Sequence, residues 1–221
     1  MKKLVLIIII TSFFASCNTR MMTKEEAYSD LYNEKPLSII VLPPINRSVN
    51  VEAKEIFYSS LNVPFTQQGY YVLPPLLTME ILKEESAYDS ELFLNNSMQK
   101  VGDLFGADAV LFTIIHSWSK STILSTINVR IEYILKSTKT DQVLFNRIGD
   151  ITFNPSTNSG SVLLNIASNM IQTAFTKEIS VARSCNNYTI IDIPKGKYHN
   201  DFGTDKLEYA GEKEFRATVN Y

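Results

Sequence analysis

Two histidines, two cysteines and a few acidic residues are the side chains of this sequence whose chemistry suggests catalysis or metal binding. His199 stands near Asp201 and Asp205, a grouping that suits a loosely held metal ion, but no element of regular spacing fixes these three side chains relative to one another. His116 follows an apolar run and is expected at the end of a strand rather than in a set of ligands. We therefore expect the chain to bind no metal and no cofactor.

A catalytic nucleophile is not indicated either. Nucleophilic catalysis needs an activated serine or cysteine beside a base, and the sequence contains no G-x-S-x-G elbow and no glycine-rich phosphate loop. The acidic pairs Glu25–Glu26 and Glu84–Glu85 are expected to be solvated surface charges. The sequence therefore favours a protein that is not an enzyme, with a hydrolase as the weaker alternative.

Cys17 has the clearest chemical context in the chain. A positively charged start precedes an apolar run over residues 4–10, and Ala15 and Ser16 stand directly before the cysteine. The run is too short to span a bilayer, so it is typical of a secretory leader. The segment resembles the lipobox of bacterial lipoproteins, with Phe14 in place of the usual leucine, and lipidation requires a thiol at the first mature position. The alternative is an ordinary secretory signal with an incidental cysteine.

Asn18 follows the cysteine, where an aspartate would resemble an inner-membrane retention signal. The outer membrane is therefore the expected location, with an N-terminal lipid in the membrane and the domain facing the periplasm. If Cys17 carries lipid, Cys185 has no partner for an intrachain disulfide. We expect Cys185 to be a packing residue in a loop at a helix end, with a reactive free thiol as the alternative.

The length and composition suit one globular domain. The chain has 221 residues, of which 45% are hydrophobic and 20% charged, and its net charge is −2. Nucleic-acid binding requires concentrated positive charge, so nucleic acid is excluded as a partner. We divide the chain into a signal peptide (1–16), a lipidated N-terminus and tether (17–35), a globular domain (36–195) and a polar C-terminal tail (196–221), which is either loosely ordered or an edge strand.

The elements that must position these residues follow the order β-α-β-α-α-β-β-β-α. Strands are expected over residues 37–42, 70–73, 107–115, 123–135 and 142–153, with turns at 117–120 and 137–141. Helices are expected over 51–68, 76–83 and 90–105, and, after a loop at 155–160, from 161 to a frayed end near 184. Pro64 must either kink the first helix or end it near Leu61 and start a new turn.

Two apolar runs indicate the interior of a sheet. Residues 37–42 and 107–115 are apolar on both faces, which is typical of strands that are covered on both sides. Residues 127–135 alternate between apolar and polar side chains, which predicts one buried and one wet face. These helices, and a mixed sheet that ends in a β-meander, predict a single-domain α/β (α+β) sandwich in which helices cover the sheet.

Several blocks of the sequence resemble a family of bacterial outer-membrane lipoproteins of unknown function, typified by a neisserial genome-derived antigen. The blocks are LPPINRS at 42–48, VPF at 63–65, QQGYYVLP at 67–74, GADAVLF at 106–112 and IPKGKYH at 193–199. Lys195 and Lys197 stand where the family pattern favours tyrosine and proline. The resemblance implies a fold similar to the N-terminal domain of TolB, which recurs in the curli secretion lipoprotein CsgG and in a lipoprotein activator of peptidoglycan synthases.

Those related domains act by contacting other proteins, so the resemblance favours an interaction role for this chain. The expected interaction surface combines a polar loop after the first strand with aromatic residues at element ends: Asn46, Arg47, Ser48, Tyr70, Tyr71 and Trp118. Tyr58 and Tyr88 belong to the same group of aromatics, for which packing in or beside the core is an equal alternative.

The leading interpretation is an assembly or interaction factor of an envelope complex. It contacts the membrane through its lipid and contacts other envelope proteins through its domain, with a homo-oligomer as one form. The alternatives are an accessory activator of a peptidoglycan synthase and, less favoured, an envelope hydrolase.

Overall fold

A mixed β-sheet is the framework of the domain in a computed structural model that describes residues 21–85, 88–121, 126–154 and 170–220. Its strands are β1 (Ser38–Val41), β2 (Ile45–Asn46), β3 (Tyr71–Val72), β4 (Ala109–Ser121), β5 (Thr126–Ser137), β6 (Val143–Asn154) and β7 (Glu214–Asn220). The order across the sheet is β3-β1-β4-β5-β6-β7, and β2 pairs with β4 beyond the end of β1. Strands β4, β5 and β6 form the antiparallel meander that the sequence predicted.

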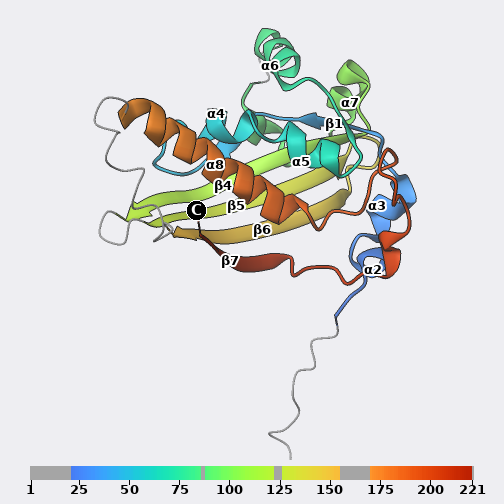
Figure 1. Cartoon of the computed structure of the whole chain (residues 1–221). Helices are drawn as coiled ribbons and strands as arrows, with labels where there is room; N and C mark the ends of the chain where they lie inside the picture. Colours follow the sequence, from blue (N-terminus) through green and yellow to red (C-terminus); the bar gives the residue numbers. More distant parts are fainter. Residues whose placement is uncertain (1–20, 86–87, 122–125, 155–169, 221) are drawn as a thin grey trace, which may run out of the picture.

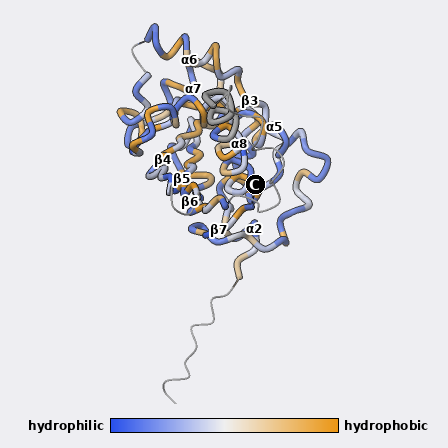
Figure 2. The backbone as a smooth tube through the Cα atoms, turned by 60° about the vertical axis from the view of Figure 1, so that its left-hand side comes forward, coloured by the Kyte–Doolittle hydropathy of each residue, from blue (hydrophilic) through white to orange (hydrophobic). Residues whose placement is uncertain are grey.

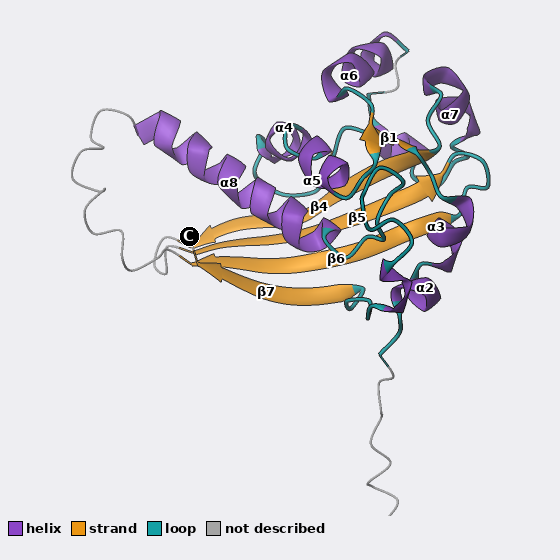
Figure 3. Ribbon diagram, turned by 45° about the vertical axis from the view of Figure 1, so that its right-hand side comes forward, coloured by secondary structure: helices purple, strands orange, loops and turns teal. Residues whose placement is uncertain are grey.

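Helices lie on both sides of this sheet. They are α2 (Lys24–Ala27), α3 (Ser29–Glu34), α4 (Ala53–Tyr58), α5 (Asn62–Gln67), α6 (Pro75–Glu84), α7 (Gln99–Phe105) and α8 (Met170–Ile190), with 3-10 turns η1 (Ser90–Phe93) and η3 (Asp205–Leu207). Figures 1 and 3 show α8 crossing the same face of the sheet as α4 and α5. None of the helices within the described ranges is long and apolar enough to cross a membrane.

Side chains of β1 alternate between two apolar clusters. Ile39 and Val41 join the larger cluster, which includes buried residues of α4, α5 and α8. Ile40 and Leu42 join the smaller cluster on the other face, with residues of α6 and α7. The strand is therefore covered on both sides, as its apolar run predicted, and the mixed α/β domain is confirmed.

The meander has one buried and one wet face. Val129, Ile131 and Tyr133 of β5 are buried, whereas the residues between them are partly exposed. The partly exposed polar residues Asn128, Arg130 and Glu132 form hydrogen bonds with Thr152 on β6, Glu214 on β7 and Asn146 on β6, respectively. The alternating pattern of the sequence is confirmed here.

Several expected boundaries were wrong. At Pro64 the second alternative is confirmed in substance: α4 ends at Tyr58 and a new helix, α5, begins at Asn62. Pro64 is the third residue of α5 rather than its first, and in this first turn its missing N–H removes no helical hydrogen bond. The helix expected over 90–105 is a 3-10 turn followed by α7. The turn expected at 117–120 is a continuation of β4, which passes a β-bulge after Ile115. Helix α8 runs to Ile190 rather than fraying near 184; the loop at 155–160 and the helix start at 161 fall outside the described residues.

The expected tether is also wrong over most of its length. Thr23 caps α2 in a reciprocal capping box with Glu26, so an ordered helix begins there. The Tyr28 hydroxyl donates to Asp192 at 2.5 Å, and both rings of Tyr28 and Tyr32 are buried. Residues 24–34 therefore belong to the folded domain, because two amphipathic turns bury aromatic side chains against it.

The C-terminal stretch is part of the sheet. Strand β7 pairs in parallel with β6 from Ile148–Glu214 to Asn154–Asn220, which confirms the edge-strand alternative for the last residues. Before it, the Asp205 carboxylate accepts hydrogen bonds from the Tyr32 hydroxyl and the backbone N–H of Lys195. The boundary expected at residue 195 is therefore wrong, because this segment packs on α3 and completes the edge of the sheet.

Asp108, at the start of β4, gives the fold a defined pH dependence. Its carboxylate accepts hydrogen bonds from the backbone N–H groups of Leu37 and Ser38 and from the Lys139 ammonium, at 3.0, 3.2 and 2.9 Å. Burial alone would raise the pKa of Asp108, but these hydrogen bonds outweigh it and lower the pKa below its usual value. The stabilisation is thus present above the ordinary pKa of about 4 and is lost as the pH falls through the lowered value.

We expect Asp108→Asn to destabilise the fold most at neutral pH. The difference in free energy of unfolding between the wild type and this variant should shrink below about pH 4, where Asp108 of the unfolded wild-type chain takes up a proton while the folded protein still holds the carboxylate charged. Urea denaturation of both proteins at pH 7 and pH 3 measures it. A difference that is the same at both pH values would contradict the assignment.

Candidate interaction site

Two diproline segments meet at one edge of the sheet. Pro43-Pro44 follows β1, and Pro74-Pro75 follows β3 and begins α6. Because β1 and β3 are parallel neighbours, both segments leave the sheet at the same end, the carboxyl end of these two strands. Between them and α4 lies a cavity of about 430 Å³, the diproline groove, which is lined by Pro43, Pro44, Lys54, Glu55, Tyr58, Ser59, Asn62, Pro75, Leu76, Met79 and Tyr88.

Tyr58 joins the two sides of the diproline groove. Its hydroxyl lies 2.7 Å from the Pro75 carbonyl oxygen and 3.4 Å from that of Val41, so one buried side chain bridges the chain at the ends of both strands. Burial raises the pKa of Tyr58 far above its usual range, which keeps the hydroxyl a neutral donor. Pro43, Pro44 and Pro75 form the floor of the groove. Proline has no backbone N–H to donate, so this floor presents mainly the apolar surface of the proline rings to a bound molecule.

The walls of the groove are adaptable and amphipathic. Leu76 is 73% exposed on α6, and the flexible Met79 lies three residues further along the same helix. The Lys54 ammonium lies 3.9 Å from the centre of the Tyr88 ring, and burial lowers the pKa of Lys54. Aromatic residues and methionine are enriched at protein contacts, and a cavity of this size accepts an apolar side chain of a partner.

The predicted polar loop lies beside this groove. A neighbouring hollow of about 320 Å³ shares Pro44, Lys54 and Tyr88 with the groove and is also lined by Asn46. The Asn46 side chain accepts hydrogen bonds from the backbone N–H and the hydroxyl of Ser48. Arg47 pairs with Glu91 at 2.9 Å on the surface. Of the three predicted loop residues, Asn46 lines the neighbouring hollow, Arg47 meets it through Glu91, and none of them lines the diproline groove itself.

The predicted aromatics divide between surface and core. Tyr71 is exposed on the edge strand β3, but Tyr70 is buried and donates its hydroxyl to the Pro194 carbonyl at 2.7 Å. Trp118 is buried against Phe57, with their ring centres 5.6 Å apart. Tyr70 and Trp118 are therefore packing residues and not part of an exposed surface. Tyr58 and Tyr88, which the sequence placed in the same group of aromatics, line the groove. The repeated diproline after two parallel strands is the sequence feature that marks its place.

The histidines lie apart from the groove and from each other. His116 Nε2 lies 2.9 Å from Glu132 on the wet face of the sheet. The His199 Nδ1 accepts from the backbone N–H of Asp201, whereas Asp205 is buried with other partners. Within the described residues, no group of three or more His, Cys, Asp or Glu side chains is placed to hold a metal ion.

Of the two cysteines, Cys185 lies within the described residues and Cys17 does not. Cys185 is fully buried inside α8 rather than in a loop at the helix end, because the helix continues to Ile190. Burial raises the pKa of its thiol well above the usual value, so it is a packing residue and not a reactive one. Cys17 falls outside the described residues.

Comparison with known protein families gives a match over most of the chain. The family model described as "Putative lipoprotein GNA1162-like" matches residues 26–196, a range that includes every residue lining the diproline groove. A curated protein of Neisseria meningitidis serogroup B (strain MC58), "Putative lipoprotein NMB1124/NMB1162", is 30% identical over 94 residues. That alignment covers 42% of this chain and 44% of the relative, so it spans less than half of either protein.

Comparison with solved structures supports the same relationship. The crystal structure of lipoprotein GNA1162 from Neisseria meningitidis is 27% identical with a TM-score of 0.50, and the match covers 66% of this chain and 99% of that chain. A PelC dodecamer from Paraburkholderia phytofirmans is more distant, with 13% identity, a TM-score of 0.44 and coverage of 74% of this chain and 90% of that chain. At that level the likeness says nothing about the oligomeric state of this chain.

Proposed function

The chain belongs to the GNA1162-like lipoprotein family, and from this membership we propose that it is an outer-membrane lipoprotein whose periplasmic domain acts as an interaction or assembly factor in an envelope complex. Its diproline groove is the proposed contact site for a protein partner. The activity is binding rather than catalysis.

The membrane anchor in this proposal is a lipid on Cys17. The short apolar leader, the small residues before the cysteine and the family match support lipidation of its sulfur. Asn18 in the second mature position supports the outer membrane as the destination. A diacylglycerol on the sulfur, together with a further acyl chain, gives stable anchoring, because two or more chains bind far more strongly than one.

The observation that carries the binding role is the diproline groove. It combines an exposed leucine, a methionine, two tyrosines and a proline floor in one cavity of about 430 Å³, which suits an apolar anchor side chain of a protein. The charged residues Lys54 and Glu55 lie at its rim, where they favour a partner with polar groups around an apolar centre.

We expect Leu76→Glu to abolish most of the partner binding. The glutamate places a charge in the apolar lining, and its desolvation on binding should lower recovery of the partner by about tenfold or more. The matched control is Leu77→Glu, because Leu77 is the next residue of α6, is 56% exposed and does not line the groove. The measurement is quantitative recovery of partners from crosslinked cells with the lipidated full chain.

The identity of the recovered partners separates the two binding hypotheses. Recovery of secretion or assembly proteins with the wild type and the Leu77→Glu control, but not with Leu76→Glu, supports the proposed role. Recovery of a peptidoglycan synthase in their place would favour the alternative, an accessory activator of that enzyme. Equal recovery with all three proteins would reject the groove as the contact site.

A further inference from the structure

The described chain begins at the end of the domain that lies opposite to α6. In Figures 1 to 3, which are turned about one vertical axis, α2 lies at the bottom of the domain and α6 at the top. Met21 and Met22 lead into α2 and run beside the segment before β7, where the Ala210 N–H donates to the Met22 carbonyl at 2.9 Å. The anchored end of the chain and the diproline groove are therefore at opposite ends.

The distance from the anchor to this end is short. Only Asn18, Thr19 and Arg20 separate Cys17 from Met21. An extended chain covers at most about 3.6 Å per residue, so the Cα atom of Met21 lies within roughly 14 Å of that of Cys17. A lipidated cysteine sits in the interfacial layer of a bilayer, so a folded domain on so short a connection must stay beside that layer.

We propose that the face around Met21 rests on the lipid surface that holds Cys17. This exit face consists of Met21, Met22, Val143, Leu207 and Tyr209, and the inference rests on the proposed lipid anchor. Its occupant is a phospholipid membrane rather than a protein or a second copy of the chain, because the membrane is the one surface that the short connection brings to this face.

The composition of the exit face suits a lipid surface. Its five side chains are between 49% and 81% exposed, with Leu207 the most exposed of them. A β-bridge between Thr23 and Tyr209 holds Tyr209 beside the start of α2. Exposed apolar side chains gathered at one end of a domain mark contact surfaces, and tyrosine is favoured at the membrane interface, where its ring is buried and its hydroxyl stays in water.

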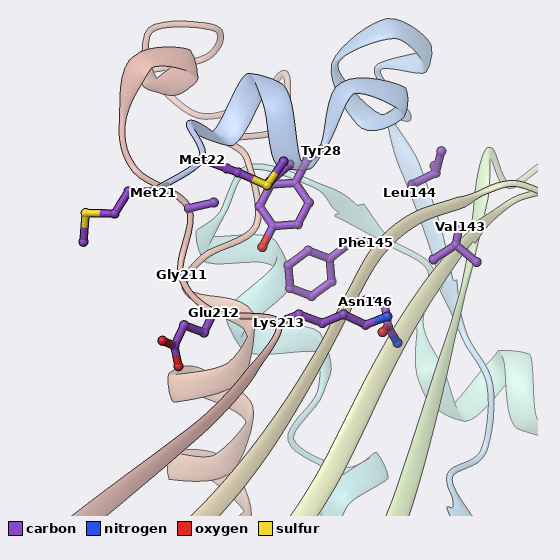
Figure 4. A pocket seen from close by; sticks show the side chains of 12 residues that line it. Met21, Met22, Tyr28, Val143, Leu144, Phe145, Asn146, Gly211, Glu212 and Lys213 are labelled. Atoms are coloured by element: carbon purple, nitrogen blue, oxygen red, sulfur yellow. The ribbon is translucent and has the colours of Figure 1, made fainter. Parts of the chain in front are cut away.

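A hollow of about 550 Å³ opens within this face. It is lined by Met21, Met22 and Val143, with Tyr28 and Phe145 among the other residues. Figure 4 shows Met22 beside the Tyr28 ring, while Met21 points away from it. The rings of Tyr28 and Phe145 pack with their centres 5.3 Å apart, so the hollow has an apolar floor beneath mobile thioether side chains.

The charges around the exit face balance in sign: Glu212 and Lys213 line its hollow, and two further pairs lie beside it. The Lys24 Nζ atom lies 2.8 Å from Glu208 Oε2, and the Lys206 Nζ atom lies 2.6 Å from Glu25 Oε1. A surface without a concentration of basic residues gains little from anionic lipids. The contact should therefore depend on apolar side chains and should be the same with neutral and with anionic phospholipids.

The test is depth-dependent quenching of a fluorophore on the lipidated full chain in vesicles. Bimane attached to Leu207→Cys should be quenched several-fold more by nitroxide-labelled phospholipids than bimane on Leu76→Cys. Both leucines are well exposed, at 81% and 73%, so the labels differ mainly in their position on the domain. Labelling is selective, because the lipid blocks the thiol of Cys17 and Cys185 is buried.

Each outcome decides the inference. Stronger quenching at position 207, in phosphatidylethanolamine vesicles with or without phosphatidylglycerol, supports it. Equal quenching at both positions, on protein that floats with the vesicles, overturns the orientation but leaves the lipid anchor intact. A label at 207 that is shielded from water but not quenched by lipid overturns it in favour of contact with a second copy of the chain. Protein that fails to float overturns both the anchor and the inference.

Discussion

Replacing Cys17 with alanine is expected to move the protein from the membrane fraction to the soluble fraction of the envelope. The substitution removes the sulfur atom, which is the only atom of residue 17 to which a diacylglycerol can be attached. The exit face alone provides a few apolar side chains, far less apolar surface than two acyl chains, each of whose buried methylenes is worth about 0.8 kcal/mol. Membrane association should therefore fall almost completely rather than partially.

Cys185→Ala provides the matched control for this prediction. It makes the same chemical change at the other cysteine, which is fully buried in α8 and out of reach of a lipid transferase. Fractionation of cells, with incorporation of labelled palmitate as a second readout, should show loss only for Cys17→Ala. Retention of this variant in the membrane fraction would refute the lipid anchor.

Replacing Gly69 with alanine is expected to destabilise the fold by about 3 kcal/mol or more. Gly69 has a φ of +86°, and a Cβ atom there would lie 2.4 Å from the backbone nitrogen of His199 and 2.8 Å from the Gly196 carbonyl oxygen. The two segments are joined by backbone hydrogen bonds, from Gly196 N–H to the Gln68 carbonyl and from Tyr198 N–H to the Gly69 carbonyl. An added methyl group must push them apart or break these bonds.

Gly203→Ala separates the effect of this contact from that of backbone conformation. Gly203 also has a positive φ, of +76°, but nothing lies within 4 Å of an added Cβ atom. Alanine there should cost only about 1–2 kcal/mol for the left-handed conformation. Urea denaturation of both variants measures the difference, and equal destabilisation would show that the contact between the two glycine segments is unimportant.

This contact explains two of the sequence blocks that resemble the lipoprotein family. QQGYYVLP and IPKGKYH are far apart in the chain, yet Gly69 and Gly196 meet backbone to backbone in the fold. Each block could be recognised in the sequence as a pattern. Their contact could not be predicted, because no local pattern in the sequence indicates that two glycines distant in the chain lie against each other in the fold.

Local patterns predicted the sheet well where burial alone decides the side-chain pattern. The two-faced apolar run of β1 and the alternation in β5 correspond directly to their burial. The prediction failed where tertiary packing recruits polar segments. Residues 24–34 lack a sustained apolar face, yet Tyr28 and Tyr32 are buried. Their hydroxyl groups can be buried without loss because they donate hydrogen bonds to the carboxylates of Asp192 and Asp205.

The candidate site was predictable only in part. The loop at Asn46 was expected from the general position of ligand crevices at strand ends, and Asn46 lines the hollow next to the groove. For Trp118 both a surface position and core packing were open, because a turn was expected at 117–120; β4 continues through this stretch, and the side chain is buried in the core. Leu76 and Met79 could be assigned to a groove only once α6 was placed against α4.

The anchor and the groove together describe a domain that is held at one end and binds at the other. In the proposed arrangement the exit face rests on the membrane, and the diproline groove, on the α6 side at the opposite end of the domain, points away from it. This arrangement leaves the groove accessible to a partner in the periplasm. It also predicts that side chains at the two ends contact different kinds of molecule.

Photo-crosslinking in living cells tests this central claim most directly. A photoreactive phenylalanine analogue is placed at Leu76 or at Leu207 of the lipidated full chain, and the products are identified by mass. The predicted result is a discrete adduct with an envelope protein from position 76 and no protein adduct from position 207. A protein adduct from position 207 with none from position 76 would contradict both the groove as the binding site and the orientation of the domain on the membrane.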